Sequence, residues 1–162
     1  MSTARTRAGR GAATIACGIA RGSTSGPSRP ALPPGSDAMV EDLEGDWHQL
    51  RVRDTRAQQE GTVVLDDALR ALLRRAGPSV AMPPAEVEAG LRTPEAATAL
   101  LHQMRQRVTE GSRRMSDALH RMYRLRDQGD LDGARQQMRD LLAAEVVPYY
   151  RELAEGQLAD LD

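Results

Sequence analysis

Three histidines, His48, His102 and His120, are the side chains of this sequence best suited to binding a metal ion or transferring a proton. A helix that binds zinc through two histidines places them four residues apart, as in the His-Glu-x-x-His pattern. None of the three has a second ligand at that spacing. On one helix, His102 and His120 would stand about five turns apart, too far to share an ion. The sequence therefore predicts no metal site and no cofactor.

Three arginines recur at heptad spacing in the second half of the chain, at Arg107, Arg114 and Arg121. Glu110 and Asp117 lie four residues before the last two, the favourable order for ion pairs along a helix. One interpretation is a solvated helix face held by such pairs. The other is an arginine row that orients an acidic partner helix, which could belong to this chain. The acidic residues of its last segment are Glu145, Glu152 and Glu155.

Tyr149, Tyr150 and Arg151 follow Pro148 and form the aromatic cluster of the sequence. One interpretation is that one tyrosine packs in the core while the other lies at the edge of the core. The alternative is a recognition site for a partner, because tyrosine and arginine are enriched at binding hot spots. Trp47 has the same two interpretations.

Sequence motifs for catalysis are missing. The sequence contains no GxxxxGK[ST] phosphate-binding loop, and no Gly-x-Ser-x-Gly elbow in the part predicted to fold. The acidic pairs Asp66-Asp67 and Asp130/Asp132 stand at predicted helix starts, where capping and the helix dipole explain them. The sequence therefore predicts a protein that is not an enzyme.

The charge of the chain is unevenly distributed. All 22 basic residues are arginines, and 23 acidic residues give a net charge of −1. Residues 1–38 hold five arginines against one aspartate, so the remainder is acidic and lacks the basic face that nucleic-acid binding needs. The single Cys17 excludes an internal disulfide, and no run approaches the roughly 18 apolar residues of a membrane span. We therefore expect a cytoplasmic protein that binds neither nucleic acid nor a membrane.

Residues 1–38 also differ in composition, because Gly, Ala, Ser, Arg, Pro and Thr dominate them. Such a segment buries too little apolar surface to offset its ordering entropy. It is a disordered tail, an upstream misread of the start codon with Met39 as the true start, or an export signal. The stretch between Arg10 and Arg21 is weakly apolar, whereas signals need about 7–15 apolar residues in a row. This favours the first two interpretations, with a helical domain at 39–162.

Turn signals divide the following part of the chain into short elements. Gly61 ends a first helix, Asp66 caps a second, and Gly77-Pro78 stop the second. The predicted elements are helices at 42–59, 67–76 and 84–91, and an extended link at 62–65.

A long apolar stripe dominates the second half of the chain. Its members alternate spacings of four and three residues over about four heptads, the pattern of a packed helix seam. They are Ala97, Leu101, Met104, Val108, Gly111, Met115, Ala118, Met122 and Leu125. Thr93-Pro94 mark the start of this helix, which runs to about Asp127. The sequence leaves open whether Gly111-Ser112 break it.

A helical hairpin follows from the end of this stripe. Gly129 is a helix stop and Asp130 a helix start, so a second helix spans 131–146. Pro148 kinks or restarts the chain after it. The sequence thus predicts an all-α fold, a small bundle of four to six helices centred on a long hairpin.

Several short segments of the chain are similar to those of a known family. They are residues 46–47, 72–75, 111–114, 122–125, 129–135 and 145–152. On these segments, residues 41–162 resemble the DUSAM-domain proteins of myxobacteria. The family is uncharacterised, so the resemblance implies no activity and no catalytic residues. It leaves residues 1–38 outside, which supports Met39 as the true start.

These observations together favour a protein–protein interaction or regulatory module. Its partner is an unidentified protein or a second copy bound through the methionine-rich stripe. The candidate partner-binding residues are Tyr149, Tyr150, Arg151, Arg107, Arg114 and Arg121. The alternative is an enzyme or small-ligand binder with a pocket between helices.

Overall fold

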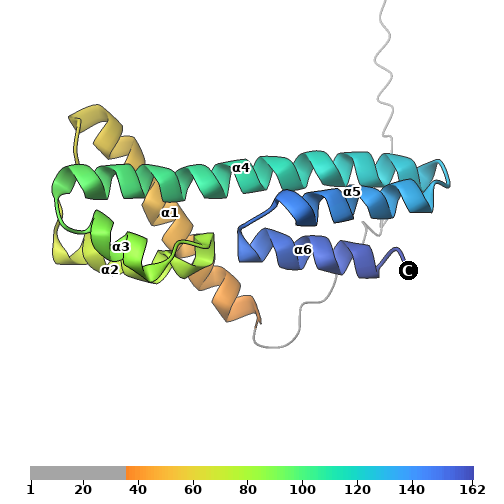
Figure 1. The fold of residues 1–162 in the computed structure, drawn as a ribbon, viewed down its shortest axis with the longest axis horizontal. Coiled ribbons are helices and arrows are strands. Elements are labelled where there is room, and N and C mark those ends of the chain that lie inside the picture. The colour runs from red at the N-terminus through yellow and green to blue at the C-terminus, as the bar shows by residue number, and fades with distance from the viewer. Residues whose placement is uncertain (1–35) are drawn as a thin grey trace, which may run out of the picture. The chain divides into compact units, whose positions relative to one another are not determined.

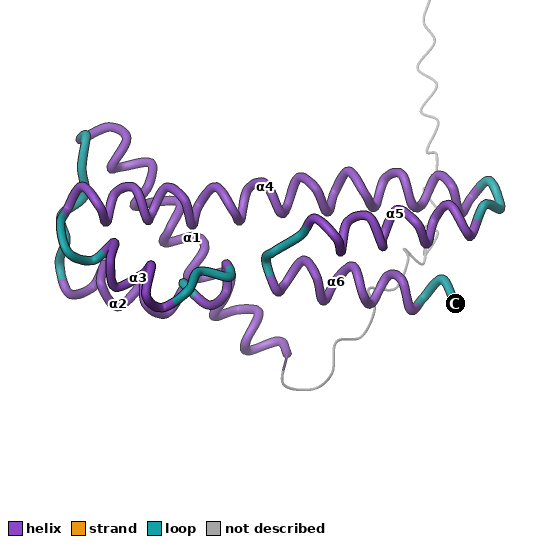
Figure 2. Tube along the Cα trace, viewed as in Figure 1, coloured by secondary structure: helices purple, strands orange, loops and turns teal. Residues whose placement is uncertain are grey.

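One long helix, α4, packs against the helices that precede it along its first half and against the next helix, α5, along its second half (Figure 1). The computed structural model describes residues 36–162, where the chain forms six α-helices and a short 3₁₀ helix, η1. They are α1 (Ser36–Glu60), α2 (Asp67–Ala76), η1 (Pro78–Val80), α3 (Pro84–Gly90), α4 (Pro94–Asp127), α5 (Leu131–Ala144) and α6 (Pro148–Ala159). Figure 2 shows the short loops between them and no strand in this part of the chain. The all-α prediction is confirmed.

The helix starts obey the capping signals of the sequence. In three of them a side-chain oxygen at the N-cap accepts a hydrogen bond from a backbone N–H of the first turn. These bonds run from Leu69 to Asp66 at 2.7 Å, from Ala96 to Thr93 at 3.2 Å and from Gly133 to Asp130 at 2.8 Å. Helices α3, α4 and α6 each begin with a proline, whose missing N–H costs nothing there.

Helix α4 is continuous through Gly111-Ser112, which resolves the question that the sequence left open. Its 34 residues span about 50 Å at the usual rise per residue. The turn into α5 uses Gly129 at φ +82°, a left-handed conformation that glycine adopts without strain. The N–H of Asp130 donates to the carbonyl of Leu125 at 2.9 Å and closes the turn.

Two predicted boundaries differ from the structure. Helix α1 begins at Ser36 instead of residue 42 and therefore includes Met39, whereas the rest of the predicted tail, residues 1–35, lies outside the described residues. Helix α5 ends at Ala144 instead of residue 146, because Glu145 has an extended backbone (φ −81°, ψ 132°). Val147 is also extended, as expected before a proline.

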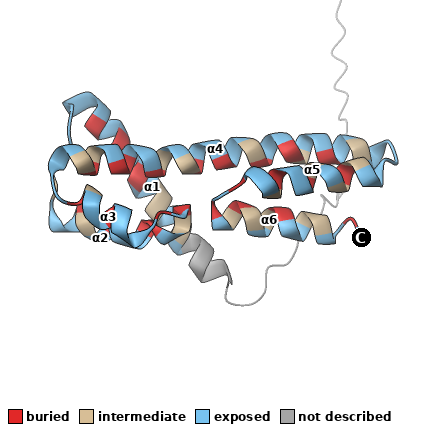
Figure 3. Cartoon of the chain, in the orientation of Figure 1, coloured by how far each residue is buried: buried red, intermediate tan, exposed pale blue. Residues whose placement is uncertain are grey.

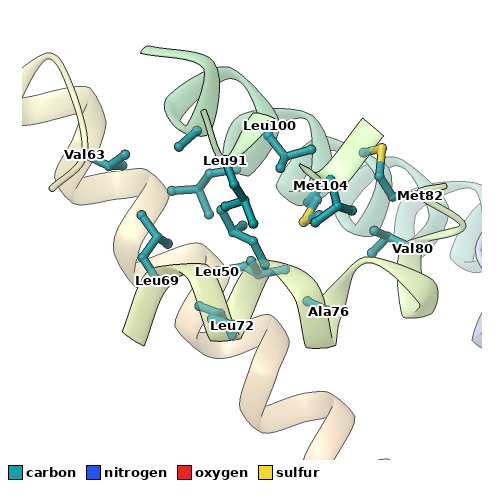
Figure 4. Close-up of a cluster of buried hydrophobic side chains, with 14 of the residues drawn as sticks. Leu50, Val63, Leu69, Leu72, Ala76, Val80, Met82, Leu91, Leu100 and Met104 are labelled. Atoms are coloured by element: carbon teal, nitrogen blue, oxygen red, sulfur yellow. The ribbon is translucent and has the colours of Figure 1, made fainter. Parts of the chain in front are cut away.

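A first apolar cluster fills the space between α1, α2, α3 and the first half of α4. Figure 4 shows its side chains gathered between these helices, among them Leu50, Leu72, Leu91 and Met104. Val80 and Met82, at and just after η1, are also buried in it, although the sequence pattern did not assign them to the core. Burying such side chains stabilises each by about 1.5–3 kcal/mol.

A second apolar cluster lies between the other half of α4 and helices α5 and α6. It includes Met115, Met122, Met138 and Ala154, which are all buried. Figure 3 shows buried positions in red along α4, α5 and α6. The stripe predicted along α4 is buried from Ala97 to Met122, and Leu125 is half-buried. The methionine-rich stripe is therefore core covered by the chain's own helices, and it offers no free surface to a second copy.

Gly111 on α4 lies directly against Tyr150 of α6. A Cβ atom placed on Gly111 would lie 2.5 Å from Cδ2 and 2.7 Å from Cε2 of Tyr150. The tyrosine ring therefore occupies the volume that any side chain at position 111 would need.

Gly111→Ala should lower the free energy of unfolding by about 1–3 kcal/mol, because the added methyl overpacks this contact. Gly156→Ala is the control, since Gly156 is also helical and has nothing within 4 Å of its would-be Cβ. That change should raise stability by about 0.5–1 kcal/mol. Urea unfolding measures both, and equal effects of the two changes would show that the contact is not tight.

Candidate functional site

Three aromatic rings, Trp47, Tyr149 and Tyr150, gather where α1 meets the start of α6. Their centroids are 5.4–5.6 Å apart. Tyr150 is buried and Tyr149 is half-buried, which confirms the interpretation of one core tyrosine and one at its edge. The indole N–H of Trp47 donates to Oγ of Ser79 at 3.1 Å. Partner binding at this cluster stays a prediction, and Tyr149 is the tyrosine whose ring is open to it.

Two of the candidate arginines donate to backbone carbonyls of their own chain. Arg151 donates to two carbonyls at the end of α5, at 2.7 and 2.9 Å. Arg107 donates to the carbonyls of Val80 and Ala81, at 3.0 and 2.6 Å. Ala81 has a left-handed backbone (φ +54°), so Arg107 holds a turn that disfavours any residue with a Cβ. Both arginines therefore close helix ends.

Arg114 faces a buried carboxylate. The side chain of Glu145 has no exposed area, and its oxygens accept hydrogen bonds from Nε of Arg114 at 3.0 Å and from the N–H groups of Val146 and Val147 at 2.9 and 2.8 Å. Arg114 also lies 3.6 Å from Glu110, the pair predicted from the helical spacing. The internal acidic partner proposed for the arginine row is thus confirmed at Arg114.

The third arginine of the row, Arg121, donates to Oε1 of Gln137 on α5 at 2.8 Å. The six candidate residues therefore fall at separate places: Arg107 beside η1, Arg121 against α5, and the others around the Glu145 carboxylate and the aromatic rings. They do not form one continuous site.

A second buried carboxylate, Asp54, lies where α1 crosses α4, and the sequence analysis did not identify it. Its Oδ1 is 3.2 Å from Nδ1 of His102, and its Oδ2 accepts a hydrogen bond from Nε2 of Gln58 at 3.0 Å. The signal was its position between Leu50 and Ala57, at spacings of four and three. That spacing puts Asp54 on the apolar face of α1.

An open groove of about 440 Å³ adjoins this pair. One wall is the Asp54, Thr55 and Gln58 side of α1, and the other is a polar stripe of α4 from His102 to Arg113. An imidazole held by a carboxylate at Nδ1 keeps its other nitrogen available, as in acid–base pairs and ligand-binding histidines. The arrangement is therefore suited to polar recognition.

A different groove, of about 480 Å³, lies between the last turns of α1 and the link before α2. Ala57, Val63 and Leu69 are buried at its floor, while Val52 and Val64 stand at its lip with 52 % and 73 % of their surface exposed. Val64 is the most exposed large apolar residue in the described part of the chain. We call this feature the valine groove.

Neither groove offers a metal-binding set. Within the described residues, no three His, Cys, Asp or Glu side chains gather closely enough to hold an ion. None of the helices described here combines the length and apolar character needed to cross a membrane.

A family model described as "Protein of unknown function (DUF2379)" matches residues 45–161. The chain belongs to this family. The resemblance seen in the sequence predicted an uncharacterised family over 41–162, and the match confirms that part of it. Comparisons with curated proteins and with solved structures found no match. The Asp54–His102 groove and the valine groove both lie within the DUF2379 region.

Arg114→Met should lower the free energy of unfolding by about 2 kcal/mol or more, because it leaves the buried Glu145 carboxylate without its cation. The loss should be smaller in a chain that also carries Glu145→Gln, and a double-mutant cycle by urea unfolding measures the difference. Arg121→Met is the control, since Arg121 bonds a neutral amide at the surface and should change stability by less than about 0.5 kcal/mol. Additive effects of the two changes would contradict the pairing.

Burial raises the pKa of the Tyr150 hydroxyl above its ordinary value near 10. Because the folded pKa exceeds the unfolded one, this stabilising contribution is complete below about pH 10 and is lost as the pH rises through the folded pKa. Tyr150→Phe should therefore reduce the loss of stability that sets in above about pH 10, measured by urea unfolding. The same change at the exposed Tyr123 is the control, and an equal effect there would contradict the assignment.

Proposed function

We propose that the chain is a non-catalytic protein–protein interaction or regulatory module that binds its partner at the valine groove. The observation that supports this is the exposure of Val52 and Val64 above a buried apolar floor. Burying such side chains against a partner is favourable at about 25 cal/mol per Å² of apolar surface. The resemblance to the DUSAM-domain proteins of myxobacteria adds a family context to this proposal and no activity.

The charges around the valine groove indicate the chemistry of the partner. Arg56 pairs with Glu60 at 2.8 Å, and Arg53 lies 3.6 Å from Asp66. Because these ions neutralise one another at the rim, the groove attracts neither an acidic nor a basic segment strongly. An apolar side chain surrounded by neutral polar groups fits it best, since interfaces combine an apolar centre with a polar rim.

The backbone of the link offers hydrogen-bond donors to a partner. The link has no regular secondary structure: Val63 N–H donates to Oγ1 of Thr98 at 3.1 Å, and Asp66 N–H donates to the carbonyl of Val64 at 2.9 Å. The N–H groups of Val64 and Leu65 make no hydrogen bond within the described part of the chain. A carbonyl of a partner segment could accept from either of these groups. The partner we propose is therefore a protein segment that brings an apolar side chain and a free backbone carbonyl.

The function is tested by capturing partners of the tagged full chain from its native cells and repeating the capture with Val64→Asp. A carboxylate at the lip should weaken binding of the partner by about tenfold or more, because a hot-spot contact is worth about 2 kcal/mol. Leu131→Asp is the matched control. Leu131 is 43 % exposed at the first position of α5, where an acidic residue suits the helix dipole.

Loss of a stoichiometric partner with Val64→Asp and its retention with Leu131→Asp would support the proposal, provided that both variants keep the melting temperature. Equal capture by the two variants, or no stoichiometric partner, would contradict it.

A further inference from the structure

The Asp54–His102 groove has more hydrogen-bond donors than acceptors left to receive them. Its two acidic residues are already engaged: both oxygens of Asp54 contact His102 and Gln58, and Glu110 lies 3.6 Å from Arg114. Ionised carboxylates only accept hydrogen bonds, so these contacts use part of their acceptor capacity. A ligand with acceptor oxygens would therefore match the donors that remain.

The donors of the groove come mainly from one stripe of α4. His102, Arg105, Thr109 and Arg113 follow one another at spacings of three and four residues, so they share a face of the helix. Neither Arg105 nor Arg113 is within ion-pair distance of a carboxylate in the described part of the chain. Arg105 donates to the hydroxyl of Thr109, which keeps its guanidinium beside the groove.

The buried Asp54 gives this stripe a fixed imidazole. The Asp54 carboxylate is 92 % buried, and removing it from water costs free energy. An apolar residue at position 54 would avoid that desolvation cost. Here Asp54 contacts Nδ1 of His102 and fixes the ring, whose side chain is 54 % exposed. Asp54 therefore orients His102 toward the side from which a ligand can approach.

We propose that the groove binds a small organic oxyanion through Arg105 and Arg113, next to the His102 imidazole that Asp54 holds in place. Arginine suits this task, because its planar fork donates two parallel hydrogen bonds to a phosphate or a carboxylate. The volume of about 440 Å³ lies in the range typical of sites for small molecules. This site is separate from the valine groove and does not depend on the protein partner proposed there.

The test is a titration of the full ¹⁵N-labelled chain with inorganic phosphate, pyrophosphate and citrate, followed by NMR at low and constant ionic strength. Amide shifts should saturate and concentrate at residues 54–58 and 102–113. Arg113→Gln should weaken binding by about fivefold or more, because it removes a charge-assisted hydrogen bond. Arg105→Gln provides a second variant with the same expectation.

Arg139→Gln is the matched control. Arg139 is exposed on α5 and its loss changes the net charge equally, so it should change the affinity by less than about twofold. Preference for phosphate or pyrophosphate would identify a phosphate ester as the ligand class, and preference for citrate would identify a polycarboxylate. Either result supports the site.

Three results would overturn the proposal. Shifts spread over α5 and α6 would place binding elsewhere. An equal effect of Arg139→Gln would show attraction by overall charge alone. No saturation up to about 10 mM of any of the three anions would mean that binding is too weak for a specific site.

Discussion

The carboxylate of Glu145 is the group on which the C-terminal half of this protein depends. It has no exposed area, yet it accepts bonds from Arg114 on α4 and from two N–H groups just before α6. An ionised carboxylate is buried at acceptable cost only when such partners surround it. Satisfying it therefore fixes the position of the loop between α5 and α6. That loop in turn places the ring of Tyr150 against Gly111, where α4 has no side chain.

Arginine side chains close the ends of η1, α3, α5 and α6. Arg70 donates to the carbonyl of Leu91 after α3, and Arg135 donates to the carbonyl of Leu161 after α6. Arg107 and Arg151 do the same for η1 and α5. Last-turn carbonyls lack partners inside a helix, and a guanidinium can serve two of them at once. The high arginine content is thus partly a means of ending short helices.

The helices were predictable from the sequence because periodicity and caps are local signals. The stripe along α4 and the caps Asp66, Thr93 and Asp130 follow from residues within a few positions of one another. Glu145 was less predictable, because its arginine lies 31 residues upstream and an acidic residue usually marks a solvated surface. The sequence named Glu145 as a possible partner of the arginine row without indicating that it is buried.

The grooves were harder to predict than the helices. His102 was assessed for metal binding by its spacing to other histidines, whereas its partner Asp54 comes from a helix 48 residues earlier. Val64 lies in a link that was expected to be extended and that has no regular secondary structure, and its exposure depends on which helices pack beside it. The tyrosine pair was divided correctly into a buried and an edge member, since Pro148 fixes where α6 begins. Local pattern therefore located the elements, and contacts between distant segments determined the sites.

The unbroken α4 has a consequence for the way this protein loses its structure. Both apolar clusters include side chains of α4. If one cluster opened, its α4 side chains would be exposed to water while the other cluster still kept the helix in place. Partial melting would leave half of that helix amphipathic and uncovered, a poor state in water. The arrangement therefore favours a single cooperative transition over the independent unfolding of two halves.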